Sequence, residues 1–143
     1  MQSIEDMSKD LLEIYAKRKA TKGFKYSEDD YLYTEFENAF PYTETNDQLQ
    51  AIQDVKRDMI SGKVMDRLIC GDVGFGKTEV AMRALFKAVE NGKQVAILAP
   101  TTILSLQHYM TAKSRTGDFG VTVEMLNRFR SSKEQKKILE DLA

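Results

Sequence analysis

The sequence predicts an α/β fold in which helices flank a parallel sheet. Three short apolar runs, at residues 67–70, 95–99 and 121–126, alternate with longer segments of helical periodicity. Strands that alternate with helices are typical of parallel sheets, because each helix carries the chain back to the edge where the next strand begins. A glycine-rich turn between the first run and the following helix is the second observation that favours this fold class.

The composition is that of an ordinary globular protein. The chain has 143 residues, of which 42% are hydrophobic and 30% are charged, enough for one domain with a core of its own. Its net charge of −1 creates no overall basic field, so binding to nucleic acid must depend on local patches. The single cysteine excludes an internal disulfide, and no apolar run approaches the ~18 residues of a membrane span. We therefore expect a soluble, cytoplasmic protein without a membrane partner.

The N-terminal part is expected to consist of three helices. Residues 3–20 carry apolar side chains at helical spacing with charges between them. A second helix, rich in aromatic residues, is expected at 28–38 and ends before Pro41, because the residue preceding a proline disfavours helix. The third helix is expected at 45–60, where Gly62 follows its last turn.

The remainder of the chain is expected to alternate strands with helices. The run at 95–99 contains no charge, as expected for a strand that is covered on both faces. The expected order is strand 67–70, helix 79–90, strand 95–99, helix 102–113, strand 121–126 and a final helix capped by Ser131 or Ser132.

A phosphate-binding loop lies between the first strand and its helix. The sequence from Gly71 to Thr78 matches G-x-x-x-x-G-K-T, whose backbone N–H groups and helix N-terminus form an anion site. We assign Lys77 to the β- and γ-phosphates of ATP and the Thr78 hydroxyl to Mg²⁺, and take both as catalytic. The expected nucleotide contacts are Gly71, Asp72, Val73, Gly74, Phe75, Gly76, Lys77, Thr78 and Glu79. The competing interpretation is a plain turn with structural glycines.

Two residues upstream of the loop are candidates for adenine recognition. The Gln48 amide both donates and accepts hydrogen bonds, which suits the adenine edge, and the Phe40 ring can stack on the base. The alternative is structural and equally well supported. Thr45 and Gln48 have the spacing of a capping box, and Phe40 can belong to the core.

Two further segments are candidates for binding nucleic-acid phosphates. Thr101 and Thr102 follow the second strand at its carboxyl end, where α/β sheets place ligands. Arg128 and Arg130 flank an aromatic residue directly after the third strand and could hold a strand backbone. The alternatives are a threonine N-cap for the first pair and a solvated loop for the second.

Several stretches resemble the bacterial transcription-repair coupling factors, which are ATP-dependent DNA translocases of helicase superfamily 2. The matching sequences are L-L-E-I-Y-A at 11–16, D-R-L-I-C-G-D-V-G-F-G-K-T-E-V-A at 66–81, P-T-T-I-L at 100–104 and R-F-R-S at 128–131. The resemblance implies a motor of two RecA-like lobes. In this arrangement residues 1–38 would be a helical lead-in, and residues 39–143 the first half of lobe one.

The resemblance also implies a function. Such a protein moves along double-stranded DNA at the expense of ATP, displaces stalled RNA polymerase and recruits excision-repair proteins. It places Phe40 and Gln48 in an adenine-reading motif, and Thr101, Thr102, Arg128 and Arg130 in motifs that contact the DNA backbone. The acidic motif and the arginine finger that complete hydrolysis would follow residue 143. We therefore expect these 143 residues to bind nucleotide without hydrolysing it.

Two other functions remain open from the sequence. One is the corresponding lobe of a branch-migration or replication-restart helicase, which shares several of these motifs. The other is a phosphate-loop nucleotide switch or kinase that does not act on DNA.

Overall fold

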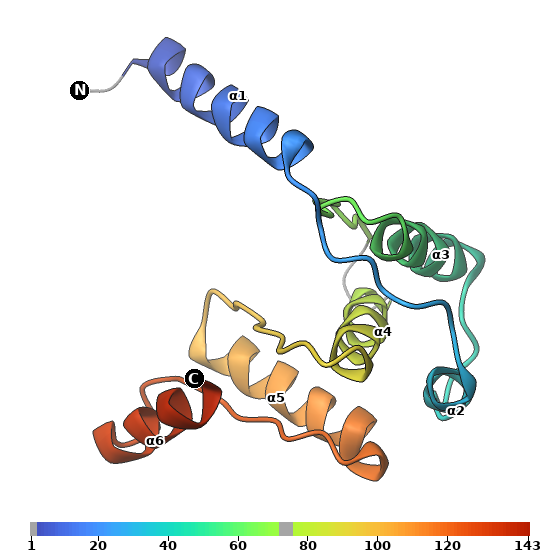
Figure 1. The fold of residues 1–143 in the computed structure, drawn as a ribbon. Coiled ribbons are helices and arrows are strands. Elements are labelled where there is room, and N and C mark those ends of the chain that lie inside the picture. The colour runs from blue at the N-terminus through green and yellow to red at the C-terminus, as the bar shows by residue number, and fades with distance from the viewer. Residues whose placement is uncertain (1–2, 72–75) are drawn as a thin grey trace.

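The computed structural model describes residues 3–71 and 76–143, and this part of the chain is helical (Figure 1). Its elements are α1 (Ile4–Ala20), α2 (Tyr31–Asn38), α3 (Asn46–Ile60), α4 (Lys77–Glu90), α5 (Thr102–Thr116), the short 3₁₀ helix η1 (Gly117–Phe119) and α6 (Ser132–Leu142). The helices predicted from the sequence are confirmed, apart from small shifts at their ends.

Most of these helices begin at a side chain that accepts a hydrogen bond from the first turn. Such a cap satisfies one of the backbone N–H groups that the helix itself leaves unpaired. The capping residues are Ser3, Asp30, Thr45, Thr101 and Ser131. Helix α4 differs, because Gly76 precedes it and supplies no side chain.

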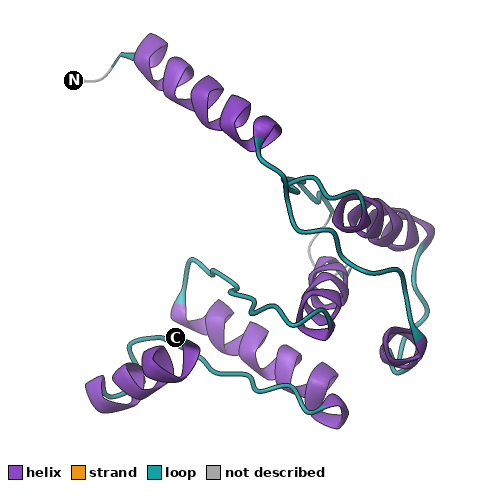
Figure 2. Cartoon of the chain, viewed as in Figure 1, coloured by secondary structure: helices purple, strands orange, loops and turns teal. Residues whose placement is uncertain are grey.

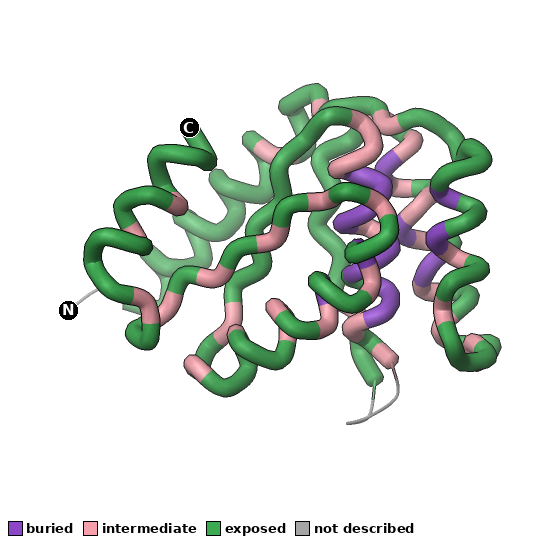
Figure 3. Tube along the Cα trace, turned by 90° about the horizontal axis from the view of Figure 1, so that it is seen from below, coloured by how far each residue is buried: buried purple, intermediate pink, exposed green. Residues whose placement is uncertain are grey.

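The core lies on two sides of α4. On one side Phe86 stacks on Phe36 of α2, with ring centroids 4.2 Å apart and the rings nearly parallel. On the other side Val80 and Ala88 pack against the apolar face of α3. The buried residues are therefore gathered on and around α4, whereas much of the remaining chain is exposed (Figure 3).

The predicted parallel sheet is not present in the described residues. Residues 67–70, 95–99 and 121–126 run as loops without a backbone ladder between them (Figure 2). Leu68 and Leu98 are 85% and 98% exposed, so these two runs lack the cover that we expected. A strand is stable only when a neighbour pairs its N–H and C=O groups, and no such pairing joins these three runs. This part of the fold-class prediction is not confirmed.

The third run nevertheless keeps the side-chain alternation of a strand. Val121 and Val123 pack against the core beside α2 and α4, while Thr122 and Glu124 are exposed. This period of two is what an extended backbone imposes, with or without a paired neighbour.

The N-terminal helices differ in how they are attached. Helix α1 projects from the rest of the chain (Figure 1), and none of its residues is buried. It is linked to the body through Arg18, which pairs with Asp66. Helix α2 is expected to belong to the same lead-in segment, but its Tyr33 and Phe36 are fully buried against α4. No helix within the described ranges is long and apolar enough to span a membrane.

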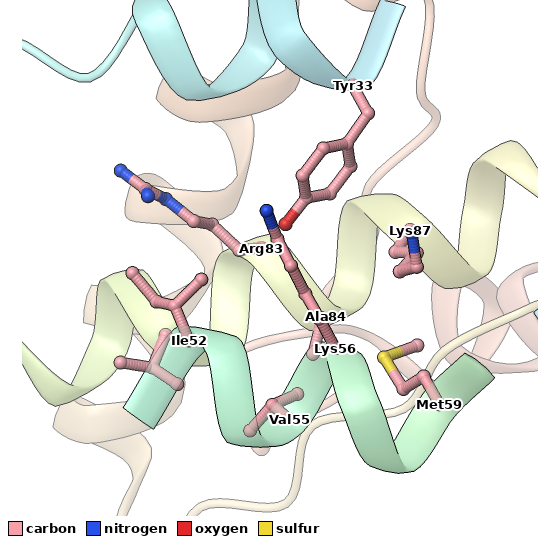
Figure 4. Close-up of a pocket in the computed structure, with 9 residues that line it drawn as sticks. Tyr33, Ile52, Val55, Lys56, Met59, Arg83, Ala84 and Lys87 are labelled. Atoms are coloured by element: carbon pink, nitrogen blue, oxygen red, sulfur yellow. The ribbon is translucent and has the colours of Figure 1, made fainter. Parts of the chain in front are cut away.

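Ion pairs join α3 and α4 to the start of α2. Asp29, which precedes α2, accepts hydrogen bonds from Lys56 at 2.7 Å and from Lys87 at 2.9 Å. Both ammonium groups lie within 5 Å of the Tyr33 ring centroid, at 4.6 and 4.8 Å (Figure 4). Burial alone would raise the pKa of Asp29, but the two lysines lower it below its usual value. The space between these side chains admits no water molecule, so they form a packed interior and not a binding cavity.

One buried carboxylate has no such partner. Both oxygens of Glu90, the last residue of α4, are buried, and no hydrogen bond satisfies them among the described residues. Burial and the neighbouring Asp30 carboxylate raise the pKa of Glu90 to about 7. The folded protein therefore retains a proton that the unfolded chain releases near pH 4.5.

Replacing Glu90 with glutamine should remove a pH dependence of stability. In the wild type, stability should fall as the pH rises from 4.5 to about 7, because only the unfolded state releases the proton readily in this range. At about pH 8 the Glu90→Gln variant should be more stable by about 1–3 kcal/mol, because glutamine stays neutral where the ionised glutamate is buried beside Asp30. Urea unfolding at about pH 5 and about pH 8 measures both effects. The exposed Glu13→Gln variant is the control, and equal pH profiles for all three proteins would contradict the prediction.

Candidate nucleotide and nucleic-acid site

The ends of the phosphate loop are described, and a lysine lies between them. The Lys77 ammonium donates a hydrogen bond to the Gly71 carbonyl at 2.6 Å, so the side chain folds back from the start of α4 toward the first residue of the motif. The predicted contacts Asp72, Val73, Gly74 and Phe75 lie outside the described residues. Thr78 is half-buried in the first turn of α4, next to Lys77.

Gly76 closes the loop at a position where only glycine fits. Its φ of 76° lies in the left-handed region, which disfavours residues with a Cβ atom. A Cβ atom built on Gly76 would also lie 1.8 Å from Nε2 of Gln48. The second glycine of the motif is therefore required by its conformation and by a close neighbour.

Gln48 both caps α3 and contacts the phosphate loop. Its Oε1 accepts from the Thr45 backbone N–H at 2.9 Å, and Thr45 Oγ1 accepts from the Gln48 N–H at 3.2 Å. The capping-box alternative is thus confirmed. The other end of the same amide, Nε2, donates to the Gly76 carbonyl at 3.2 Å. Gln48 therefore ties the start of α3 to the last residue of the loop, and adenine recognition by its side chain stays a prediction.

Phe40 lies half-buried beside two arginines. The guanidinium carbons of Arg83 and Arg115 are each 5.5 Å from the centre of the Phe40 ring, within the range of a cation–π contact. The Tyr42 ring approaches it edge-on, with centroids 5.6 Å apart. Stacking of Phe40 on a base is a prediction that this arrangement leaves open.

The Glu79 carboxylate is held by two arginines, and its contact with a nucleotide stays a prediction. Its side chain is 5% exposed and accepts hydrogen bonds from Nε of Arg115 at 2.9 and 3.1 Å and from Nε of Arg83 at 3.3 Å. Arg83 also pairs with Glu44. The sequence analysis missed both arginines. Glu79 and Arg83 have the i, i+4 spacing of a helical ion pair, but no local pattern pointed to Arg115.

A groove of about 460 Å³ brings together the two segments expected to bind nucleic acid. Its walls are formed by Ala99, Pro100, Thr101, Thr102, Ile103, Ser105, Leu126, Asn127 and Arg128. Asn127 donates to the Ser105 hydroxyl at 3.2 Å and so joins the two walls. Thr101 also caps α5 by accepting from the Leu104 N–H, as the alternative interpretation predicted.

The two arginines of the second segment have different environments. Arg128 is exposed and lines the groove, and among the described residues no carboxylate pairs with it. Arg130 is half-buried and lies 3.7 Å from both Glu124 and Glu134. The structure thus brings Thr101, Thr102 and Arg128 to one surface, whereas Arg130 is engaged by its own neighbours. Ser105 and Asn127 are groove residues that the sequence analysis did not select.

The chain belongs to the DEAD/DEAH box helicase family, whose model matches residues 45–143. It is also similar to bacterial transcription-repair-coupling factors. It is 52% identical to that of Bacillus subtilis over 98% of the chain, and 54% identical to that of Haemophilus influenzae over 99%. The chain spans 12% of the length of each of these relatives.

The fold is similar to part of a solved helicase structure. A structure of RecG bound to a three-way DNA junction superposes with a TM-score of 0.82 over 91% of this chain, at 37% sequence identity. The match covers 18% of the RecG chain. The described helices therefore have the arrangement of a RecA-like helicase fold, although the sheet of that fold is not present among them.

The two roles of Gln48 should be separable by substitution. Gln48→Glu keeps an acceptor for the Thr45 N–H but cannot donate to Gly76, so it should preserve α3 and weaken nucleotide binding roughly tenfold. Thr45→Ala should lower the free energy of unfolding by about 1 kcal/mol while changing nucleotide affinity less. Titration with a non-hydrolysable ATP analogue and urea unfolding measure the two quantities. If both variants lose affinity and stability in the same proportion, Gln48 has no separate role at the loop.

Proposed function

We propose that this chain is the ATP-binding part of an ATP-dependent double-stranded DNA translocase that displaces stalled RNA polymerase and couples transcription to excision repair. The family and the similarity to transcription-repair-coupling factors support this proposal. The observation that carries it is the position of Lys77. Its ammonium reaches across the ends of the loop to Gly71, where the phosphates of a nucleotide would replace the carbonyl as its partner.

The proposed function requires Mg²⁺, which needs few ligands from the protein. Across the described residues, no group of three or more histidine, cysteine, aspartate or glutamate side chains could hold a metal ion. Mg²⁺ usually keeps several waters and takes few protein ligands beside the phosphates, so the Thr78 hydroxyl fits as its contact here. Hydrolysis also needs a positioned water and a second positive charge, so these residues alone should bind ATP without turning it over.

The groove suits the backbone of DNA better than its bases. Thr101, Thr102 and Ser105 carry hydroxyls, and Asn127 carries an amide, which are groups that hydrogen-bond to phosphate oxygens. Arg128 adds a positive charge at the rim that no carboxylate of the described residues pairs with. Contacts of this kind position a protein on the duplex without reading its sequence, as a translocase requires.

We also infer that the chain works in the cytoplasm and within a larger motor. Residues 67–70, 95–99 and 121–126 are the strand positions of its parallel sheet, supported by their apolar character and by the packing of Val121 and Val123. The division into a lead-in at 1–38 and a lobe at 39–143 belongs to the same proposal. Because α2 packs into the core, the independent part of the lead-in is α1.

A branch-migration helicase is the second candidate, favoured by the similarity to RecG. The two functions differ in what the motor displaces. The longer protein that we propose contains this chain should release stalled RNA polymerase from DNA when ATP is present. Unwinding of branched DNA junctions without polymerase release would favour the second candidate. An ATPase that duplex DNA does not stimulate would reject both.

Lys77→Ala should weaken ATP binding and abolish the DNA-stimulated ATPase of that longer protein. The substitution removes the ammonium that would contact the β- and γ-phosphates. Isothermal titration with ATP, with and without Mg²⁺, measures binding, and phosphate release measures turnover. Lys9→Ala, which changes an exposed lysine of α1, is the control and should match the wild type. Equal affinity of Lys77→Ala and wild type would overturn the nucleotide assignment.

Arg128→Ala should weaken binding of duplex DNA far more than Arg130→Ala. Arg128 lines the groove without a carboxylate partner in the described part of the chain, whereas Arg130 lies between two glutamates. Loss of one phosphate contact should reduce the slope of log affinity against log salt by about 1. Fluorescence anisotropy with a labelled duplex over a salt series measures both quantities. If Arg130→Ala has the larger effect, the groove is not the main DNA contact.

A further inference from the structure

Arg115 links the helix of the phosphate loop to α5. Its Nε donates to Oε2 and Oε1 of Glu79 at 2.9 and 3.1 Å, and its NH2 group also bonds to the Glu79 carboxylate. The same NH2 group donates to the Phe36 carbonyl at 3.1 Å, and the guanidinium lies 4.0 Å from the centre of the Phe36 ring. The guanidinium is thus held on one face and along one edge by α2 and α4.

One end of this link lies beside the phosphate loop, and the helix that carries the other end extends to the groove. Glu79 follows directly after Lys77 and Thr78 in the first turn of α4. Arg115 lies in the last turn of α5, and the opposite end of α5 carries Thr101 and Thr102 at the wall of the groove. A helix of this length spans roughly 20 Å, at about 1.5 Å per residue. Helix α5 is therefore a rigid connection between the phosphate loop and the groove.

The attachment of α5 is uneven along its length. Ala112 and Thr116, in its C-terminal half, are buried against the core around Met82 and Phe86. In the N-terminal half, Ile103 is 68% exposed and no residue from 102 to 109 is buried. A displacement at the Glu79 end would therefore move the groove end, where less packing resists it.

We propose that Arg115 is a positioning residue that couples nucleotide binding at the phosphate loop to duplex DNA binding at the groove. The inference rests on the proposed function, because it needs both sites to be occupied. A phosphate bound by Lys77 and Thr78 acts on the same helical turn that carries Glu79. Arginine holds a carboxylate through more than one N–H group in a fixed geometry, so the pair transmits a displacement of Glu79 to α5.

Arg83 provides a matched control. Its side chain is 3% exposed, against 9% for Arg115, and it contacts the same Glu79 carboxylate at 3.3 Å. Arg83 belongs to α4 itself, however, and its other partner is Glu44, which precedes α3. Removing Arg83 takes a buried arginine from Glu79 without cutting the connection between α4 and α5.

The test measures how much nucleotide binding changes the affinity for duplex DNA, and not either affinity by itself. In the longer protein, the dissociation constant of a fluorescein-labelled duplex is determined by anisotropy, with and without a saturating non-hydrolysable ATP analogue. The ratio of the two constants is the coupling factor, and the affinity of the analogue with and without duplex must yield the same factor. In the wild type we expect a factor of about 5–100.

Arg115→Met should bring this factor to about one, while Arg83→Met should leave it near the wild-type value. Arg115→Lys keeps a charge beside Glu79 but loses the multiple contacts, so it should retain only part of the coupling. This milder variant decides the question if Arg115→Met does not fold. If Arg115→Met folds and its coupling factor is unchanged, the coupling role of Arg115 is wrong, while the proposed function stands. If Arg115→Met does not fold, an unchanged factor in Arg115→Lys has the same meaning. A factor of one in the wild type, with both ligands bound, also overturns this role. A wild type that binds neither ligand rejects the proposed function as well.

Discussion

The two-sided burial of α4 is the constraint on which the rest of the structure depends. Phe86 stacks on Phe36 of α2, and Val80 and Ala88 pack on α3, so α4 has little solvent-facing surface. A helix in this position cannot shift without disturbing both clusters, because packed interiors do not deform continuously. The start of α4 is also the end of the phosphate loop. The core thereby fixes the position of Lys77 and Thr78.

Burying α4 also required burying its charges. Glu79, Arg83 and Lys87 are all less than a tenth exposed, and each has an oppositely charged partner. An unpaired charge at these positions would be strongly destabilising, so each carboxylate and each cation constrains where its partner's helix must lie. The ion pairs reach to the segment before α2, to α5 and to the segment before α3. The helices around α4 are therefore oriented by charge pairing as well as by apolar packing.

Sequence reasoning was most reliable for features that depend on neighbouring residues. The caps at Thr45 and Ser131, and the helices that they begin, depend on contacts three or four residues apart. The sheet was not confirmed because a strand depends on a distant neighbour, and the apolar runs around Leu68 and Leu98 have none among the described residues. Thr101 and Arg128 could be predicted as groove residues because each follows an apolar run in the sequence. The pairing of Arg130 with Glu124 and Glu134 depended on the fold around it.

The sequence by itself determined the helices and the glycine at position 76, because these depend on backbone conformation and short-range hydrogen bonds. Only the tertiary structure decided that Glu79 is held by Arg115 and Arg83, that Gln48 reaches the loop while it caps α3, and that α2 belongs to the core. The physical reason is that each of these contacts either joins different helices or pairs with a buried charge. Their partners are chosen by the packing of helices, which the spacing of residues along the chain does not encode.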